Sequence, residues 1–195
     1  VMWQLLALVK PLAHIMAFTI TMGTLGFLSA IFIMVLGAMG LSHLLGFEGH
    51  LNFTQILTAL IALAVARGIL RYLEQMSGHY IAFKLLALLR DKVFSALRRL
   101  AFVKLQDKQA GQLVSLVTND IELLEVFYAH TIAPIMIAFF TSAILVTVFA
   151  HISAWFALVA LIAYLCIGVV LPIITTKLAR EDGRKYRELV GEMND

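Results

Sequence analysis

Long apolar stretches without any charged side chain alternate with short charged segments along this chain. No Asp, Glu, Lys or Arg occurs in residues 11–47, 49–66 or 126–176. A bilayer with a hydrocarbon core about 30 Å thick is crossed by ~20 apolar residues in a helix rising 1.5 Å per residue. The first two stretches each hold one crossing, and the third is long enough for two. The pattern predicts an all-α membrane protein with four transmembrane helices.

Helix-breaking residues and short turns between the apolar stretches set the expected bounds of these helices. The crossings are expected at about 14–40, 54–80, 132–149 and 154–172. Four glycines on the first crossing would let another helix approach closely: Gly23, Gly26, Gly37 and Gly40. The last two crossings are joined by the short turn 150–153, which makes them an antiparallel hairpin. Pro134 and Pro172 fall near the ends of crossings, where we interpret them as boundary residues.

Several of the predicted helices continue beyond the bilayer. Neither a proline nor a turn cluster interrupts 55–105, and leucines at three- and four-residue spacing alternate with charges there, so the second helix is expected to extend in water to about 101. A connector at 102–108 follows. A second amphipathic stretch, 110–130, leads into the third crossing, and an extension at 173–195 follows the fourth.

The positions of the basic residues predict the orientation of the chain. Short cytoplasmic loops carry an excess of Lys and Arg. The loops 41–53 and 150–153 contain none of the 15 basic residues, whereas the segment 75–130 contains seven, the end at 175–195 contains five and the end at 1–12 contains Lys10. Both ends and the central projection are therefore expected in the cytoplasm, with the crossings in the plasma membrane of a bacterial cell.

Composition narrows the class of protein further. Hydrophobic residues make up 62% of the chain and charged residues 14%, which a soluble core of this size could not accommodate, so the lipid bilayer is an expected partner. The net charge of +3 does not indicate nucleic-acid binding, because the basic residues alternate with apolar ones and accompany most acids. The single cysteine, Cys166, forms no intrachain disulfide.

A candidate site lies near the inner end of the second crossing. Arg67, Arg71 and Glu74 are spaced so that neighbours share a helix face, and ionisable residues inside a membrane are costly. One interpretation is structural, with the arginines reaching toward the headgroups and Glu74 pairing with Arg71. The other is a site for an anion. Tyr72 could flank such a site, and His79 follows one turn later with an imidazole that could bind a metal.

Residues in the central segment resemble the first intracellular loop of ABC exporters. The similarity rests on Leu89-Arg90, Phe94, the run 97–100 and the run 111–120. The motif residues of the last run are Gly111, Leu113, Ser115 and Asp120. The resemblance implies that the chain is the first four of six helices of an exporter transmembrane domain. It also implies a coupling helix that docks on a nucleotide-binding domain, formed by Phe102, Val103, Lys104, Leu105, Gln106, Asp107 and Lys108.

The run 67–74 followed by His79 is most similar to the CydC side of CydDC-type exporters. That subfamily is associated with export of cysteine or glutathione, with haem and with cytochrome bd assembly. The resemblance implies that His79 is a haem ligand and that Arg67, Arg71, Tyr72 and Glu74 belong to a substrate or haem site. Gln75 stands where the subfamily commonly has arginine.

No G-x-x-x-x-G-K-[ST] phosphate loop occurs in the sequence, so this chain alone is not expected to be an enzyme or to bind a cofactor by itself. ATP and Mg²⁺ would bind in an ATPase domain that we expect after residue 195. The expected function is ATP-driven export by alternating access, with a second half-transporter subunit as partner. Two alternatives remain: an exporter of lipids, peptides or drugs, and a membrane scaffold with a cytoplasmic helical hairpin.

Overall fold

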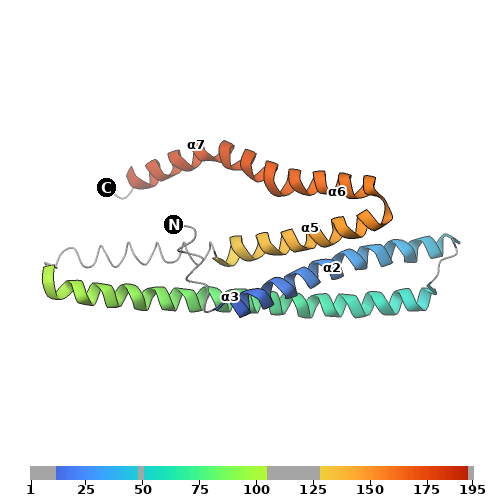
Figure 1. Cartoon of the computed structure of the whole chain (residues 1–195), viewed down its shortest axis with the longest axis horizontal. Helices are drawn as coiled ribbons and strands as arrows, with labels where there is room; N and C mark the ends of the chain where they lie inside the picture. The colour runs from blue at the N-terminus through green and yellow to red at the C-terminus, as the bar shows by residue number, and fades with distance from the viewer. Residues whose placement is uncertain (1–11, 48–50, 105–127, 193–195) are drawn as a thin grey trace. The chain divides into compact units, whose positions relative to one another are not determined.

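The computed structural model describes residues 12–47, 51–104 and 128–192, and every element within these ranges is helical (Figure 1). Four helices are long and apolar enough to cross a membrane: Ala13–Leu44, Phe53–Ala96, His130–Ile152 and Ala154–Arg180. The predicted all-α fold with four membrane-spanning helices is thereby confirmed. Of the expected coupling helix, residues 105–108 lie outside the described ranges, as does the motif run 111–120.

Helices α2 (Ala13–Leu44) and α3 (Phe53–Lys104) pack side by side as an antiparallel pair (Figure 1). The end of α2 is closed by Gly46, whose φ of 86° suits a residue without a β-carbon. The Gly46 N–H donates to the carbonyl of His43, and the Phe47 N–H donates to that of Ser42, which is the Schellman arrangement at a helix end. At the start of α3, the Gln55 side chain accepts a hydrogen bond from the Asn52 N–H.

Helix α3 is a single uninterrupted element of 52 residues. At 1.5 Å per residue it is about 78 Å long, more than twice the thickness of the hydrocarbon core. It continues through Lys104 without a break at 102, so the first three residues of the expected coupling helix belong to α3. Helix α3 therefore runs from the outer end of the second crossing to the beginning of the expected coupling helix.

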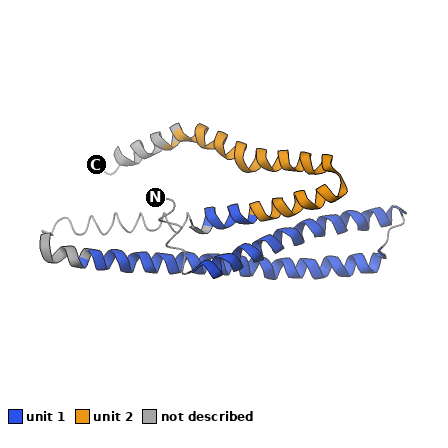
Figure 2. Cartoon of the chain, in the orientation of Figure 1, with its two compact units in different colours: residues 1–137 blue, residues 138–195 orange. Residues whose placement is uncertain are grey.

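The chain divides into two compact units, residues 1–137 and 138–195 (Figure 2). The core of the first unit lies where α2, α3 and the start of α5 (Ala133–Ile152) meet, beside the π-helical turn η2 (Tyr128–Ile132). Its buried apolar residues are Leu12, Met16, Ile81, Leu85 and Ala133.

The glycines of α2 differ in what they contact. Gly23, Gly26 and Gly40 are buried, and each has a side chain of α3 or α5 close to the position of a β-carbon. Gly37 is exposed, and none of the residues that the structure describes outside its own helix backbone lies within 4 Å of that position. The expectation of close helix approach is confirmed for three of the four glycines, whereas no described helix approaches Gly37.

The second unit contains the rest of α5, then α6 (Ala154–Leu165), the π-helical turn η3 (Cys166–Val170) and α7 (Leu171–Glu192). Ser153 alone separates α5 from α6, and its hydroxyl accepts a hydrogen bond from the Trp155 N–H at 3.3 Å. The expected turn at 150–153 is therefore shorter than predicted, because residues 150–152 remain helical and the serine caps the next helix.

Both prolines of the last two crossings follow a π-helical turn. Pro134 is the second residue of α5, just after η2, and Pro172 is the second residue of α7, just after η3. A proline lacks the N–H that would bond to a carbonyl in the preceding turn, and a π-turn is one way in which a helix accommodates such a defect. The expectation of simple boundary residues is corrected for Pro172, which lies inside a continuous helical run.

Candidate functional site

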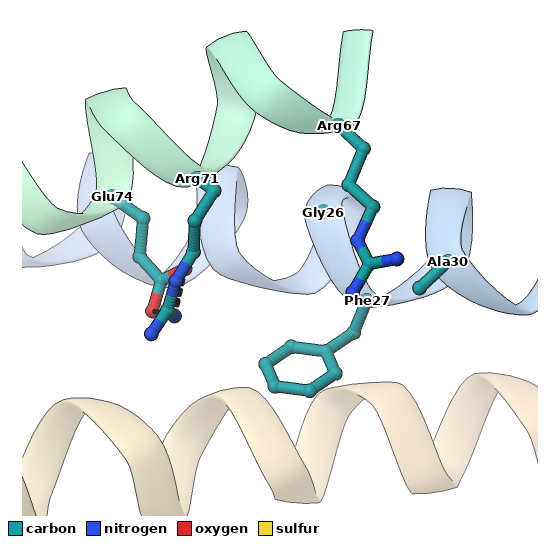
Figure 3. A pocket seen from close by; sticks show the side chains of 6 residues that line it. All are labelled: Gly26, Phe27, Ala30, Arg67, Arg71 and Glu74. Atoms are coloured by element: carbon teal, nitrogen blue, oxygen red, sulfur yellow. Dashed lines mark hydrogen bonds and ion pairs between the residues drawn. The ribbon is translucent and has the colours of Figure 1, made fainter. Parts of the chain in front are cut away.

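Three ionisable side chains of α3 line a cavity against α2. Arg67, Arg71 and Glu74 lie four and three residues apart, which places them along one face of the helix. The opposite wall is made by Gly26, Phe27 and Ala30 of α2, and the cavity has a volume of about 260 Å³ (Figure 3). All six residues belong to the first compact unit. The small side chains of Gly26 and Ala30 on α2 thus leave space in front of the charged residues on α3.

Arg71 and Glu74 form an ion pair. Nη1 of Arg71 lies 2.7 Å from one carboxylate oxygen of Glu74 and 2.8 Å from the other, so one nitrogen donates to both. The Glu74 side chain is 11% exposed, whereas that of Arg71 is 55% exposed. The carboxylate is therefore the member of the pair that depends on its partner, because an unpaired buried charge is far more costly than an exposed one.

Gly23 of α2 is what allows Glu74 to be buried. A β-carbon at this position would lie 3.2 Å from Cδ of Glu74 and would overlap the side chain of Ile137 on α5. The backbone of α2 consequently covers the carboxylate. Next to it, the hydroxyl of Thr19 donates to Oγ of Ser77 at 2.8 Å, and the Ser77 hydroxyl donates to the carbonyl of Leu73 at 2.7 Å.

Arg67 is the remaining charge in the cavity. Its side chain extends from α3 toward α2 beside Phe27 (Figure 3). Within the described residues it makes no hydrogen bond or ion pair, in contrast to Arg71. Two guanidinium groups and one carboxylate leave the cavity with a net positive charge, and a guanidinium suits a carboxylate or phosphate through paired hydrogen bonds. The arrangement can bind an anion.

Both sequence-based interpretations of this region thus have a counterpart in the structure. The ion pair expected from the structural interpretation is present at Arg71 and Glu74, and the anion interpretation has a cavity with Arg67 free to pair. The assignment of these residues to a substrate site stays a prediction.

Tyr72 and His79 do not line this cavity. The Tyr72 side chain is exposed. The His79 ring stacks on Phe83 with centroids 6.1 Å apart, and it meets the ring of His130 from η2 edge-on at 6.3 Å. The five residues of the candidate set therefore divide into three that line the cavity, an exposed tyrosine, and a separate histidine with an aromatic neighbour.

His130 is a residue to which the sequence alone assigned no chemistry. Both histidines lie near the predicted inner boundary of adjacent crossings, so their common depth was a signal that could have linked them. The haem implied for His79 can be tested against this geometry. Two neighbouring exposed imidazoles are suitable ligands for iron. Because His79 does not line the arginine cavity, a haem bound through His79 would lie outside that cavity.

The helices and the cavity define a class: an all-α, polytopic membrane protein with a charged site between two of its membrane-spanning helices. Residues 15–192 match the family described as the ABC transporter transmembrane region. The chain belongs to that family.

Two curated proteins are similar to the chain. It is 86% identical over 195 residues to the "Probable ABC transporter ATP-binding/permease protein" of Haemophilus influenzae, with 100% of the chain and 35% of that protein aligned. It is 22% identical over 184 residues to the "Glutathione/L-cysteine transport system ATP-binding/permease protein CydD" of Bacillus subtilis, with 94% of the chain and 32% of that protein aligned. The chain spans about a third of the length of these relatives.

Proposed function

We propose that the chain is the membrane-domain part of an ATP-driven exporter that works by alternating access. The family membership and the names of both relatives, each an ATP-binding/permease protein, support this function. The observation that carries the proposal is a net-positive cavity lined by Arg67, Arg71 and Glu74 between two membrane-spanning helices. An ionisable group inside a membrane is costly and is usually retained for a function.

Helix α3 provides the mechanical link in this proposal. It carries the three charged residues of the cavity and continues without interruption to Lys104. Residues 102–108 are the segment that the resemblance assigns to docking on the ATPase domain. A displacement of that end, caused by closure of two ATPase domains around ATP, would be transmitted along the helix to the cavity, because a continuous helix moves largely as one body.

The cavity favours an anionic substrate. The carboxylate of a small molecule would pair with Arg67, while Arg71 stays with Glu74. We further propose that the substrate is a low-molecular-weight thiol and that the chain is of the CydC-like subtype, with haem bound through His79. The relative named for glutathione and L-cysteine transport supports the thiol, and the run 67–74 with His79 supports the subtype.

A second half-transporter subunit completes the pathway in this proposal. In the membrane-spanning window of Ala154–Arg180, none of the residues is buried, and α6 has no buried side chain. Such a helix is left to face lipid, further helices of the same protein or another subunit. Four helices from one chain do not enclose a route across the membrane, so the substrate would pass between two subunits.

The test uses the full-length protein reconstituted in lipid vesicles, with ATP hydrolysis measured as a function of glutathione and cysteine concentration. Arg67→Gln is expected to raise the half-stimulating concentration about 10-fold or more, since a hydrogen bond to a charged group contributes about 1.5–3 kcal/mol. The matched control is Arg180→Gln, which removes an exposed arginine outside the cavity.

Three outcomes would contradict parts of the proposal. Equal stimulation of wild type and Arg67→Gln would exclude Arg67 from the substrate site. Stimulation by a neutral lipid or drug alone would favour the exporter of that class over a thiol exporter. A full-length protein without ATPase activity would favour the membrane scaffold.

A further inference from the structure

His79 and His130 come together from two different elements. His79 lies on α3, and His130 lies in the π-helical turn η2 that precedes the third crossing. Their ring centroids are 6.3 Å apart, and the ring planes are inclined at 74°. The two residues are 51 positions apart in the sequence. Their proximity is therefore a product of the tertiary fold.

Neither imidazole is engaged in a hydrogen bond within the part of the chain that the structure describes. Both residues are exposed. Each ring thus has a nitrogen atom that is free to bind a metal. The second ring contact of His79, with Phe83, orients its ring through stacking and occupies no nitrogen.

The distance between the rings suits a shared metal. Imidazole nitrogen binds zinc at about 2.0–2.1 Å, which places the centroids of two imidazoles on one metal about 5–6.5 Å apart, according to the angle at the metal. The observed 6.3 Å lies at the upper end of this range, which corresponds to a nitrogen–metal–nitrogen angle of about 180° and therefore to two ligands on opposite sides of one metal. The π-helical geometry around His130 is a second observation, because single π-turns occur frequently at functional sites.

We propose that His79 and His130 together bind one transition-metal centre. Imidazole is a ligand for zinc, copper, nickel and iron alike, so the shared chemistry is a metal held by two neutral imidazole nitrogens. The centre would be a divalent ion or the iron of a haem, and water, a further ligand or the porphyrin would complete its coordination. Such a centre would tie α3 to the start of the third crossing. The assignment of His130 does not depend on the transported substrate.

The experiment uses the full-length protein, purified without a histidine tag, in two arms. In the first arm, Cu²⁺ is titrated and the bound ion is examined by electron paramagnetic resonance. Wild type is expected to show one site with two nitrogen ligands. Both His79→Ala and His130→Ala should weaken this site at least about 10-fold, because even the loss of a group that only supports a ligand costs 10–100-fold in affinity.

In the second arm, hemin is titrated and followed by its absorption spectrum. A six-coordinate spectrum in wild type that is lost or becomes five-coordinate in both variants identifies the centre as haem iron. Two-nitrogen Cu²⁺ binding without a hemin complex identifies it as a divalent ion.

His14→Ala and His151→Ala are matched controls, since both remove exposed histidines elsewhere on the membrane helices. They are expected to bind as wild type does. Thermal unfolding of all variants without metal separates loss of a ligand from loss of the fold. Binding in either arm that depends on His79 alone, or that survives both single substitutions, overturns the proposal, as does the absence of binding in both arms.

Discussion

Gly23 of α2 and Glu74 of α3 lie in direct contact. A β-carbon on Gly23 would lie 3.2 Å from Cδ of Glu74 and would overlap the side chain of Ile137. Because the glycine has no side chain, the backbone of α2 can cover the carboxylate, which stays paired with Arg71. The close approach of two helices and the burial of the Glu74 carboxylate thus depend on the same small residue.

Gly23→Ala is expected to destabilise the protein by about 1–3 kcal/mol, the usual effect of extra volume in a packed interior. The measurement is the thermal unfolding temperature of the full-length protein in detergent. Gly37→Ala is the matched control, because it adds the same methyl group to the same helix where nothing lies within 4 Å. Alanine favours the helix there, so its effect should be neutral or stabilising by up to about 1 kcal/mol. An unfolding temperature equally low for both variants would contradict the contact at Gly23.

The Arg71–Glu74 pair predicts unequal effects of its two members. Arg71→Ala leaves a carboxylate that is 11% exposed without its partner, and we expect a loss of about 1–3 kcal/mol. Glu74→Gln should cost less, because Arg71 is half exposed and the amide still accepts a hydrogen bond from it. The double variant should be more stable than Arg71→Ala alone. The unfolding free energies of wild type, the two single variants and the double variant give the coupling energy between the two side chains. A coupling energy near zero would show that the ion pair does not contribute to stability.

The crossings could be predicted from the sequence because charge-free length is a local property. The ion pair could be expected as well, since Arg71 and Glu74 are three residues apart on one helix. The different roles of Gly23 and Gly37 could not, because both are glycines on the same apolar helix and only the partner helix distinguishes them. The His79–His130 contact follows from no local spacing, and its only signal in the sequence was the similar depth of the two histidines near the inner ends of adjacent crossings.

Among the described residues, a buried hydrogen bond between the side chains of Thr19 and Ser77 joins α2 to α3. Thr19→Val removes the donor to Ser77 Oγ, and we expect a loss of about 0.6–1.7 kcal/mol, the range found for hydrogen bonds between membrane helices. Thr21→Val is the control on the same helix, because that exposed hydroxyl bonds only to the carbonyl of Ala17. Thermal unfolding checks both variants. If Thr21→Val is as destabilising as Thr19→Val, the effect belongs to the threonine itself rather than to the contact between helices.

Ser153 is the single residue that separates α5 from α6, and its hydroxyl caps α6 by accepting a hydrogen bond from the Trp155 N–H. The first N–H groups of a helix have no partner within the helix, so loss of this acceptor leaves one of them to water or lipid headgroups. Ser153→Ala is expected to cost about 1 kcal/mol, whereas Ser153→Asp should retain the cap and the stability of wild type.

The control is Thr147→Ala, which removes an exposed hydroxyl. Among the described residues this hydroxyl bonds to the Ala143 carbonyl of its own helix, so the unfolding temperature should change little. Hydrogen exchange at the amides of residues 154–157 gives a local measurement: exchange should be faster in Ser153→Ala and unchanged in Ser153→Asp. Equal exchange in all variants would mean that the serine hydroxyl does not hold the start of α6.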